Sequence, residues 1–310
     1  MSSGALLRVR HLVSSIAPMI RTNRFQVILL LTVGLSIALL GCDSESGGAG
    51  GSSGGVLRIL VTNDDGVGAP GIDAIVEALI TDPNNEVVVC APAEERSGKG
   101  DNTIATDPTC GSGAAMRSST ASGYEDATWA VDGCPADAVI YALENLYPDS
   151  PPDVVLSGIN SGQNVGNTGD GGTLSQISGT VGAAKTAACA DVPALASSQG
   201  RGDTIDFDAG VAEVLRWLDN NRAALLAGEV AVENITSINI PSCDTGEIRG
   251  QAEVPLGTAL PDYVPSLIAP QDCESTREDP QDDLEAFFNG YVSVTPVPRN
   301  SSMTCDKLDN

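Results

Sequence analysis

Oxygen-bearing side chains follow three apolar segments of this chain. They are Asn63, Asp64 and Asp65 after Leu57–Val61, Ser97 after Glu86–Ala91, and Asn160 after Asp153–Leu156, in the expected loop Ser157–Asn160. Carboxylate, hydroxyl and amide oxygens suit a hard divalent cation such as Mg²⁺ or Mn²⁺. Adjacent aspartates also cannot both ionise cheaply unless a cation or solvent stabilises them. The pattern therefore predicts a metal site, although Asp64-Asp65-Gly66 is also a common turn sequence.

A second group of residues has the character of an anion site. Ser178-Gly179-Thr180 opens the Ala-rich segment Gly179–Ala190, which we expect to be helical. The free N–H groups and the dipole at a helix N-terminus attract anions, and the two hydroxyls could contact phosphoryl oxygens. Ordinary capping by Ser or Thr is the alternative interpretation. A cation site and an anion site in one crevice indicate phosphate-ester chemistry, in which the metal polarises the phosphoryl group and activates water.

The segments around these residues predict a doubly wound, mainly parallel α/β sheet. Leu57–Val61 is a short apolar strand, and Pro70-Gly71 opens a helix whose apolar residues follow helical spacing. Glu86–Ala91 is the next strand, which completes a β-α-β unit. In such sheets, ligands bind beyond the carboxyl ends of the strands, where the oxygen-bearing residues lie.

The same alternation continues along the chain. Further helices are expected at Ala136–Leu146, Gly179–Ala190 and Phe207–Leu226, and further strands at Asp153–Leu156, Pro193–Ala196, Ile235–Ile240 and Tyr291–Val297. The acidic, Pro-rich stretch Asp244–Asp283 has no clear periodicity, so we expect an irregular arm there.

Several catalytic classes are excluded by missing residues. The only histidine is His11, so the folded domain cannot contain a Ser-His-Asp triad, a phosphohistidine or a His-ligated metal. No GxxxxGK[ST] motif occurs, which argues against a P-loop NTPase. No GxGxxG follows the first strand, which argues against a standard dinucleotide fold.

The N-terminal segment has the features of an export signal. Arg21 and Arg24 precede the apolar run Phe25–Leu40, which is short for a transmembrane helix and ends in a lipobox-like Leu39-Leu40-Gly41-Cys42. We therefore expect a signal peptide over residues 1–42 with lipidation at Cys42, a Gly/Ser-rich linker over 43–55 and a folded domain over 56–310. This places the domain in the bacterial cell envelope, lipid-anchored on the periplasmic or other extracytoplasmic face. An uncleaved anchor is the alternative.

Charge and cysteine content add two expectations. With 16 basic and 41 acidic residues, the net charge of −25 repels nucleic-acid polymers, so none is expected as a partner. Of the 8 cysteines, those other than Cys42 can form disulfides in an oxidising compartment, and their odd number leaves at least one unpaired. Cys90 lies in an apolar strand and is expected to be buried.

Six motifs, in order, resemble those of the SurE family of 5′/3′-nucleotidases. They are ILVTNDDGVGAPGI (59–72), APAEERSG (91–98), VDGCPADAV (131–139), LSGINSGQNVG (156–166), SGTVGAA (178–184) and GYVSVTP (290–296). The similarity spans roughly residues 56–298. It implies a Rossmann-like fold with an extended C-terminal arm used in dimerisation, and hence a homodimer or larger assembly.

The resemblance also implies an activity and a set of residue roles. The activity is hydrolysis of nucleoside 5′- and 3′-monophosphates by a metal-bound water, with one Mg²⁺ or Mn²⁺ per subunit. The implied metal ligands are Asp64, Asp65, Ser97 and Asn160, and Asp64 is the expected catalytic carboxylate. The implied phosphate pocket consists of Asn63, Asn164, Ser178, Gly179 and Thr180.

This chain departs from the family pattern in two places. Residues 167–177 form a longer connection than the family pattern predicts, and they border the expected pocket, so substrate preference is open. Cys134 replaces the usual Thr of a GTPAD-like segment. The alternatives are a broad-specificity acid phosphatase or polyphosphatase, and a non-catalytic nucleotide-binding lipoprotein. In each case the membrane is expected to be contacted by the lipid anchor only.

Overall fold

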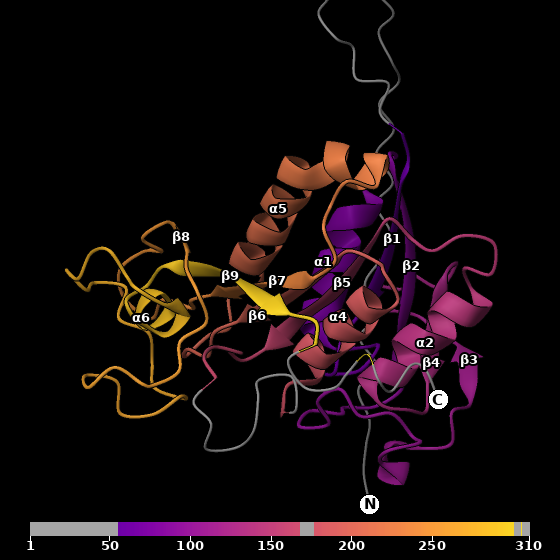
Figure 1. The fold of residues 1–310 in the computed structure, drawn as a ribbon, viewed down its shortest axis with the longest axis horizontal. Helices are drawn as coiled ribbons and strands as arrows, with labels where there is room; N and C mark the ends of the chain where they lie inside the picture. The colour runs from indigo at the N-terminus through magenta and orange to yellow at the C-terminus, as the bar shows by residue number, and fades with distance from the viewer. Residues whose placement is uncertain (1–54, 168–176, 301–304, 306–310) are drawn as a thin grey trace, which may run out of the picture. The chain divides into compact units, whose positions relative to one another are not determined.

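The computed structural model describes residues 55–167, 177–300 and 305. Its 9-stranded sheet has the order β3-β4-β2-β1-β5-β6-β7-β9-β8 (Figure 1). The strands are β1 Leu57–Thr62, β2 Asn85–Pro92, β3 Ala115–Arg117, β4 Thr128–Val131, β5 Val154–Ser161, β6 Ala194–Gln199, β7 Asn234–Ile240, β8 Gln251–Glu253 and β9 Val292–Pro298. The helices are α1 Pro70–Ile80, the 3-10 helix η1 Pro108–Cys110, α2 Pro135–Asn145, α4 Gly179–Cys189, α5 Phe207–Ala227 and α6 Asp283–Phe288.

The central part of the sheet is parallel. Strands β4, β2, β1, β5, β6 and β7 pair in parallel with their neighbours, whereas β3 is antiparallel to β4, and β9 is antiparallel to β7. The chain builds outward from β1 through β2 and β4, and then returns to add β5, β6 and β7 on the other side of β1. This confirms the doubly wound, mainly parallel sheet and puts the switch in direction between β1 and β5, where such folds bind ligands.

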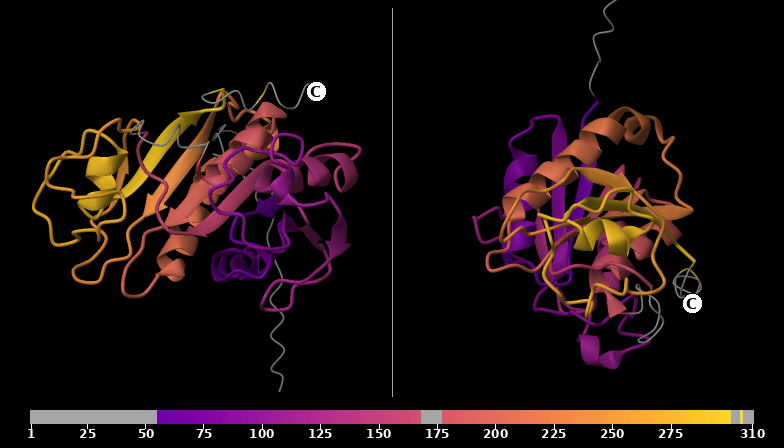
Figure 2. Two further views of the ribbon diagram at one scale, coloured as in Figure 1. Left: turned by 90° about the horizontal axis from the view of Figure 1, so that it is seen from below. Right: turned by 90° about the vertical axis from the view of Figure 1, so that its left-hand side faces the viewer.

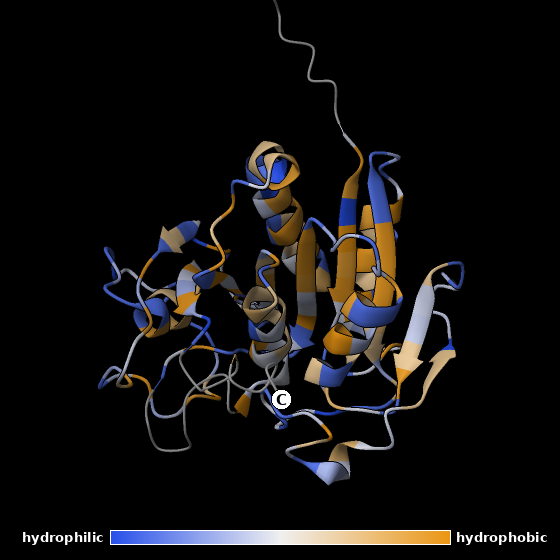
Figure 3. Ribbon diagram, turned by 45° about the vertical axis from the view of Figure 1, so that its right-hand side comes forward, coloured by the Kyte–Doolittle hydropathy of each residue, from blue (hydrophilic) through white to orange (hydrophobic). Residues whose placement is uncertain are grey.

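Helices cover both faces of the sheet. On one face α1 and α5 pack against Ile59 and Val61 of β1, and on the other face α2 and α4 pack against Leu60. Because β1 is buried on both sides, its sequence is an almost continuous apolar run instead of an alternating one. Figure 3 shows the apolar colouring of the central strands.

The helices expected from periodicity are all present, but the strand boundaries differ. We expected β5 to end at Leu156 and Ser157–Asn160 to form a loop, and this was wrong. Strand β5 continues to Ser161, because its register against β6 shifts between Ser157 and Asn160 and pairing then resumes. Strands β3, β4 and β8 and helix α6 were missed, since segments of three to six residues carry too little periodicity to be recognised.

Residues between β7 and β9 form the expected irregular arm, at one end of the sheet (Figure 2). Its own small core includes Leu284 and Phe287 of α6, and Val165 from the segment after β5 joins that core. The carboxylate of Asp283 accepts hydrogen bonds from the N–H groups of Gly166 and Gly257, each at 2.7 Å. Burial raises the pKa of Asp283 to about 6. The arm is therefore fastened to the segment that follows β5.

Three disulfides join Cys110 to Cys134, Cys189 to Cys305 and Cys243 to Cys273. Cys90 is buried and unpaired, as its apolar strand predicted. Cys110, Cys134 and Asp137 lie close together, but both sulfurs belong to a disulfide and cannot ligate a metal.

The N-terminal features lie outside the described residues. These are the expected signal peptide, Cys42 and nearly all of the linker. In the part of the chain that the structure describes, no helix is both long and apolar enough to span a bilayer.

Candidate active site

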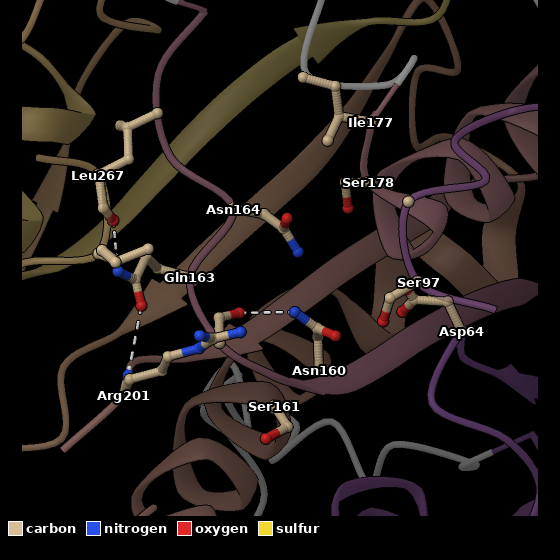
Figure 4. Close-up of a pocket in the computed structure, with 13 residues that line it drawn as sticks. Asp64, Ser97, Asn160, Ser161, Gln163, Asn164, Ile177, Ser178, Arg201 and Leu267 are labelled. Carbon is tan, nitrogen blue, oxygen red and sulfur yellow. Dashed lines mark hydrogen bonds between the residues drawn. The ribbon is translucent and has the colours of Figure 1, made fainter. Parts of the chain in front are cut away.

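One pocket of about 210 Å³ lies at the carboxyl ends of the central strands (Figure 4). It brings together Asp64 after β1, Ser97 after β2, Asn160 near the end of β5, Asn164 beyond it and Ser178 before α4. Segments far apart in the sequence thus supply carboxylate, hydroxyl and amide groups to one small volume.

Asp64 is the most constrained of these residues. Its side chain is 3% exposed, and its Oδ1 accepts a hydrogen bond from the Thr180 hydroxyl at 2.6 Å. Burial raises the pKa of Asp64 to about 6, the Thr180 hydrogen bond opposes this, and the charge of Asp65 adds to it. Among the described residues, no basic side chain forms an ion pair with it. A buried, uncompensated carboxylate is a frequent feature of a functional site.

The N-terminus of α4 reaches Asp64 because residue 179 is a glycine. A Cβ atom at Gly179 would lie 2.7 Å from the Cβ of Asp64 and 2.9 Å from the Cγ of Pro135. Any larger residue would push the helix away from the strand end. Gly179 and Thr180 therefore hold Asp64 in place, and neither lines the pocket itself.

Ser178 both caps α4 and lines the pocket. Its Oγ accepts a hydrogen bond from the N–H of Val181 at 3.1 Å. The capping interpretation of this residue is thus correct, and it does not exclude a role in ligand binding. The first N–H groups of a helix have no partner within the helix, so this end of α4 supplies donors for an anion.

Hydrogen bonds from Arg96 and Ser97 hold the loop after β2 in place. The N–H of Arg96 donates to the Asp64 carbonyl at 2.7 Å, and its Nε donates to the Cys110 carbonyl at 3.1 Å. The N–H of Ser97 donates to Glu95 at 2.8 Å, and hydrogen bonds from Ser97, its hydroxyl included, lower the pKa of Glu95. The Ser97 hydroxyl oxygen remains available as an acceptor at the pocket.

The two asparagines of the pocket are oriented by their own amide groups. Asn160 donates from Nδ2 to the Gly162 carbonyl at 2.6 Å, so its amide oxygen is left for another partner. Asn164 donates from Nδ2 to the Ser198 hydroxyl at 2.9 Å, and its backbone exchanges hydrogen bonds with the Asn239 side chain. Asn239, on β7, was not singled out from the sequence.

Asp65 and Asn63 do not line this pocket. Asp65 accepts from the N–H of Ser161 at 3.0 Å and lines an adjoining hollow. Burial raises the pKa of Asp65, whereas the charge of Arg201 opposes this. Asn63 is fully buried and closes its turn with two hydrogen bonds to Gly66, so it supports the loop from beneath.

Eight residues that line the pocket were not predicted as site residues: Gly98, Ser161, Gly162, Gln163, Ile177, Arg201, Leu267 and Ile268. Arg201 follows β6, so the rule about strand carboxyl ends could have identified it. Leu267 and Ile268 belong to the arm, which has no periodicity, and no sequence signal places them beside the strand ends.

The family model described as "Survival protein SurE" matches residues 59–260. This chain belongs to the SurE family. A protein of Brevibacillus brevis named 5'-nucleotidase SurE is 35% identical over 255 residues, covering 78% of this chain and 90% of the relative. A protein of Rhizorhabdus wittichii with the same name is 32% identical over 265 residues, covering 78% of this chain and 93% of the relative.

A solved structure supports the same assignment. The SurE protein from Aquifex aeolicus superposes with a TM-score of 0.61 at 26% identity, covering 82% of this chain and all of that protein. This agreement confirms the predicted SurE-like α/β fold.

Proposed function

We propose that this SurE-family protein hydrolyses nucleoside monophosphates, with 5′-esters as the main and 3′-esters as further substrates. The observation that carries the proposal is the position of buried Asp64 against the N-terminus of α4, in one pocket with Ser97 and Asn160. The relatives named 5'-nucleotidase SurE support the choice of substrate.

Asp64, Ser97 and Asn160 of this pocket, together with Asp65 of the adjoining hollow, fit a divalent cation such as Mg²⁺ or Mn²⁺. Burial raises the pKa of both Asp64 and Asp65, so a bound cation would relieve the cost of two neighbouring charges. With the free oxygens of Ser97 and Asn160, these carboxylates offer the hard ligands that such ions prefer. The bound ion would polarise the phosphoryl group and lower the pKa of water.

The remaining steps fall to side chains of the chain itself. Ser178 and the first N–H groups of α4 bind phosphoryl oxygens, and Asn164 orients the ester from the other side. Thr180 fixes Oδ1 of Asp64, which leaves Oδ2 as the atom that accepts a proton from the attacking water.

A phosphate-release assay tests this proposal. The panel contains 5′- and 3′-nucleotides, p-nitrophenyl phosphate and polyphosphate, each with Mn²⁺, Mg²⁺ or EDTA. We expect metal-dependent turnover that favours nucleotides. Equal turnover of the whole panel would indicate a broader phosphatase instead, and absence of turnover with every metal would leave only nucleotide binding. Turnover that EDTA does not affect would contradict the metal-dependent mechanism.

We also propose that Cys42 is lipidated and anchors the domain outside the cytoplasm, as a homodimer or larger assembly. The three disulfides support an oxidising compartment. Palmitate labelling and membrane fractionation test the anchor, and Cys42→Ser should move the protein to the soluble fraction. Unchanged membrane attachment would indicate an uncleaved apolar anchor. Light scattering of the purified domain measures the assembly.

A further inference from the structure

Arg201 differs from every other arginine that the structure describes. The guanidinium groups of the others form ion pairs, hydrogen bonds or aromatic contacts within the fold: Arg58, Arg96, Arg117, Arg216, Arg222, Arg249, Arg277 and Arg299. The Arg201 guanidinium has no such partner among the described residues. Its positive charge lowers the pKa of Asp65. In a chain with 16 basic and 41 acidic residues, an arginine without a carboxylate partner is unusual.

The surrounding backbone holds Arg201 in the pocket. A Cβ atom at Gly162 would lie 3.0 Å from its Nε, so the glycine leaves room for the side chain to lie across it. The Gln163 side chain accepts from the N–H of Arg201 at 3.3 Å and donates to the carbonyl of Leu267. Gln163 thereby joins the segments after β5 and β6 to the arm.

Arg201 lies on the opposite side of the pocket from Asp64, Ser97 and Ser178. Figure 4 shows Asp64, Ser97 and Ser178 at one side of the pocket and Arg201 with Gln163 and Leu267 at the other, separated by Asn160 and Asn164. A phosphoryl group bound at the N-terminus of α4 would therefore point its alcohol toward Arg201.

We infer that Arg201 binds a second phosphate group, carried by the alcohol part of the substrate. The inference rests on the proposed function and adds nucleoside bisphosphates to its substrates, as the ones that this site favours. A guanidinium recognises phosphate with two parallel hydrogen bonds. Leu267 and Ile268, 37% and 71% exposed, offer apolar surface beside it for the uncharged sugar and base. The strongly negative chain repels such a substrate, so a local cation is needed to hold it.

Matched substrates test the inference. Values of kcat and KM are measured with Mn²⁺ for adenosine 5′-monophosphate and adenosine 3′,5′-bisphosphate, on the wild type, Arg201→Gln and Arg201→Lys. We expect kcat/KM of the wild type to be about tenfold higher for the bisphosphate than for the monophosphate. This ratio corresponds to about 1.4 kcal/mol, the contribution of one charge-assisted hydrogen bond. Arg201→Gln should remove most of this preference through KM, and Arg201→Lys should keep part of it. High salt should reduce the preference, because Arg201 is exposed.

Arg216→Gln is the control for the change in net charge, because Arg216 lies on α5 in an ion pair with Glu213. It should keep the wild-type preference. Equal kcat/KM of the wild type on both nucleotides would overturn the inference. An equal fall of kcat for both nucleotides in Arg201→Gln would also overturn it, because Arg201 would then act on the phosphoryl group that is cleaved.

Calorimetry separates this inference from the proposed function. If the wild type hydrolyses neither nucleotide, the proposed function fails, but binding of the same two nucleotides can still be measured. Tighter binding of the bisphosphate that is lost in Arg201→Gln would support the second-phosphate site on its own. Equal binding of both nucleotides would overturn it.

Discussion

The two sides of the pocket are built in different ways. The side that contains Asp64 consists of strand ends and the N-terminus of α4. Asp64, Ser178 and Thr180 are buried there and Thr180 bonds to Asp64, although Ser97 is exposed. The side that contains Arg201 consists of loops and the arm, with exposed side chains and an arginine without a partner in the described residues. Rigid placement suits the reacting atoms, since small displacements there are costly to catalysis. Side chains on loops suit recognition of the leaving alcohol, because selectivity for that part of the substrate does not require such precise positions.

The largest expected effect comes from Asp64→Asn. Removing this charge should lower kcat/KM by about 100-fold or more, because both cation binding and proton acceptance depend on the carboxylate. The fold should remain, since the amide is nearly isosteric. Phosphate release and circular dichroism measure the two effects. Asp219→Asn, at an exposed position of α5, is the control. Normal turnover of the Asp64 variant would mean that Asp64 only forms a turn.

Gly179→Ala tests how close the approach of α4 must be. The added Cβ would meet the Cβ of Asp64 at 2.7 Å, so we expect a loss of about 1–3 kcal/mol in the free energy of unfolding and a fall in kcat/KM of more than tenfold. Gly68→Ala is the matched control, since a Cβ there would have no atom within 4 Å. Denaturation and kinetics measure both. Equal behaviour of the two variants would show that the helix can move without cost.

Thr180→Val removes the hydroxyl that donates to Asp64 while keeping the shape of the side chain. Because this hydrogen bond lowers the pKa of Asp64, its loss should raise that pKa. We expect the acid limb of the kcat/KM profile to move up by about one pH unit, with roughly fivefold lower activity at the wild-type midpoint. Thr180→Ser should keep the wild-type profile. An unshifted limb in the valine variant would show that Asp64 does not control it.

The smallest effect on turnover is expected at Asp283, which fastens the arm. Its folded pKa of about 6 lies above the usual 3.8, so its contribution to stability is complete below about pH 4 and is lost as pH rises through 6. The loss should approach about 3 kcal/mol. Asp283→Asn should flatten this part of the stability profile, as measured by urea unfolding between pH 4 and 8. If stability falls equally steeply with pH in the variant, a group other than Asp283 causes the fall.

The sequence identified the hydrolytic side of the pocket better than the other side. Asp64, Ser97 and Asn160 come from motifs at strand ends and Ser178 from a motif at a helix start. Parallel strands bring their carboxyl ends to one edge without further information. Ser157–Asn160 was mistaken for a loop because the register shift of β5 depends on its pairing with β6. Neighbouring residues of one motif also differ in role. Asn63 supports the turn, whereas the adjacent Asp64 lines the pocket.

The sequence by itself determined the central parallel strands, the four longer helices, the buried Cys90 and the chemical type of the residues at the strand ends, because these follow from local periodicity and composition. The tertiary structure alone decided that Thr180 bonds to Asp64, that the Gln163 side chain joins Arg201 to the arm, and that Leu267 lies beside the pocket. These contacts join residues far apart in the chain, and no local pattern encodes such pairings. They form only when burial of the two cores has fixed the loops between the elements.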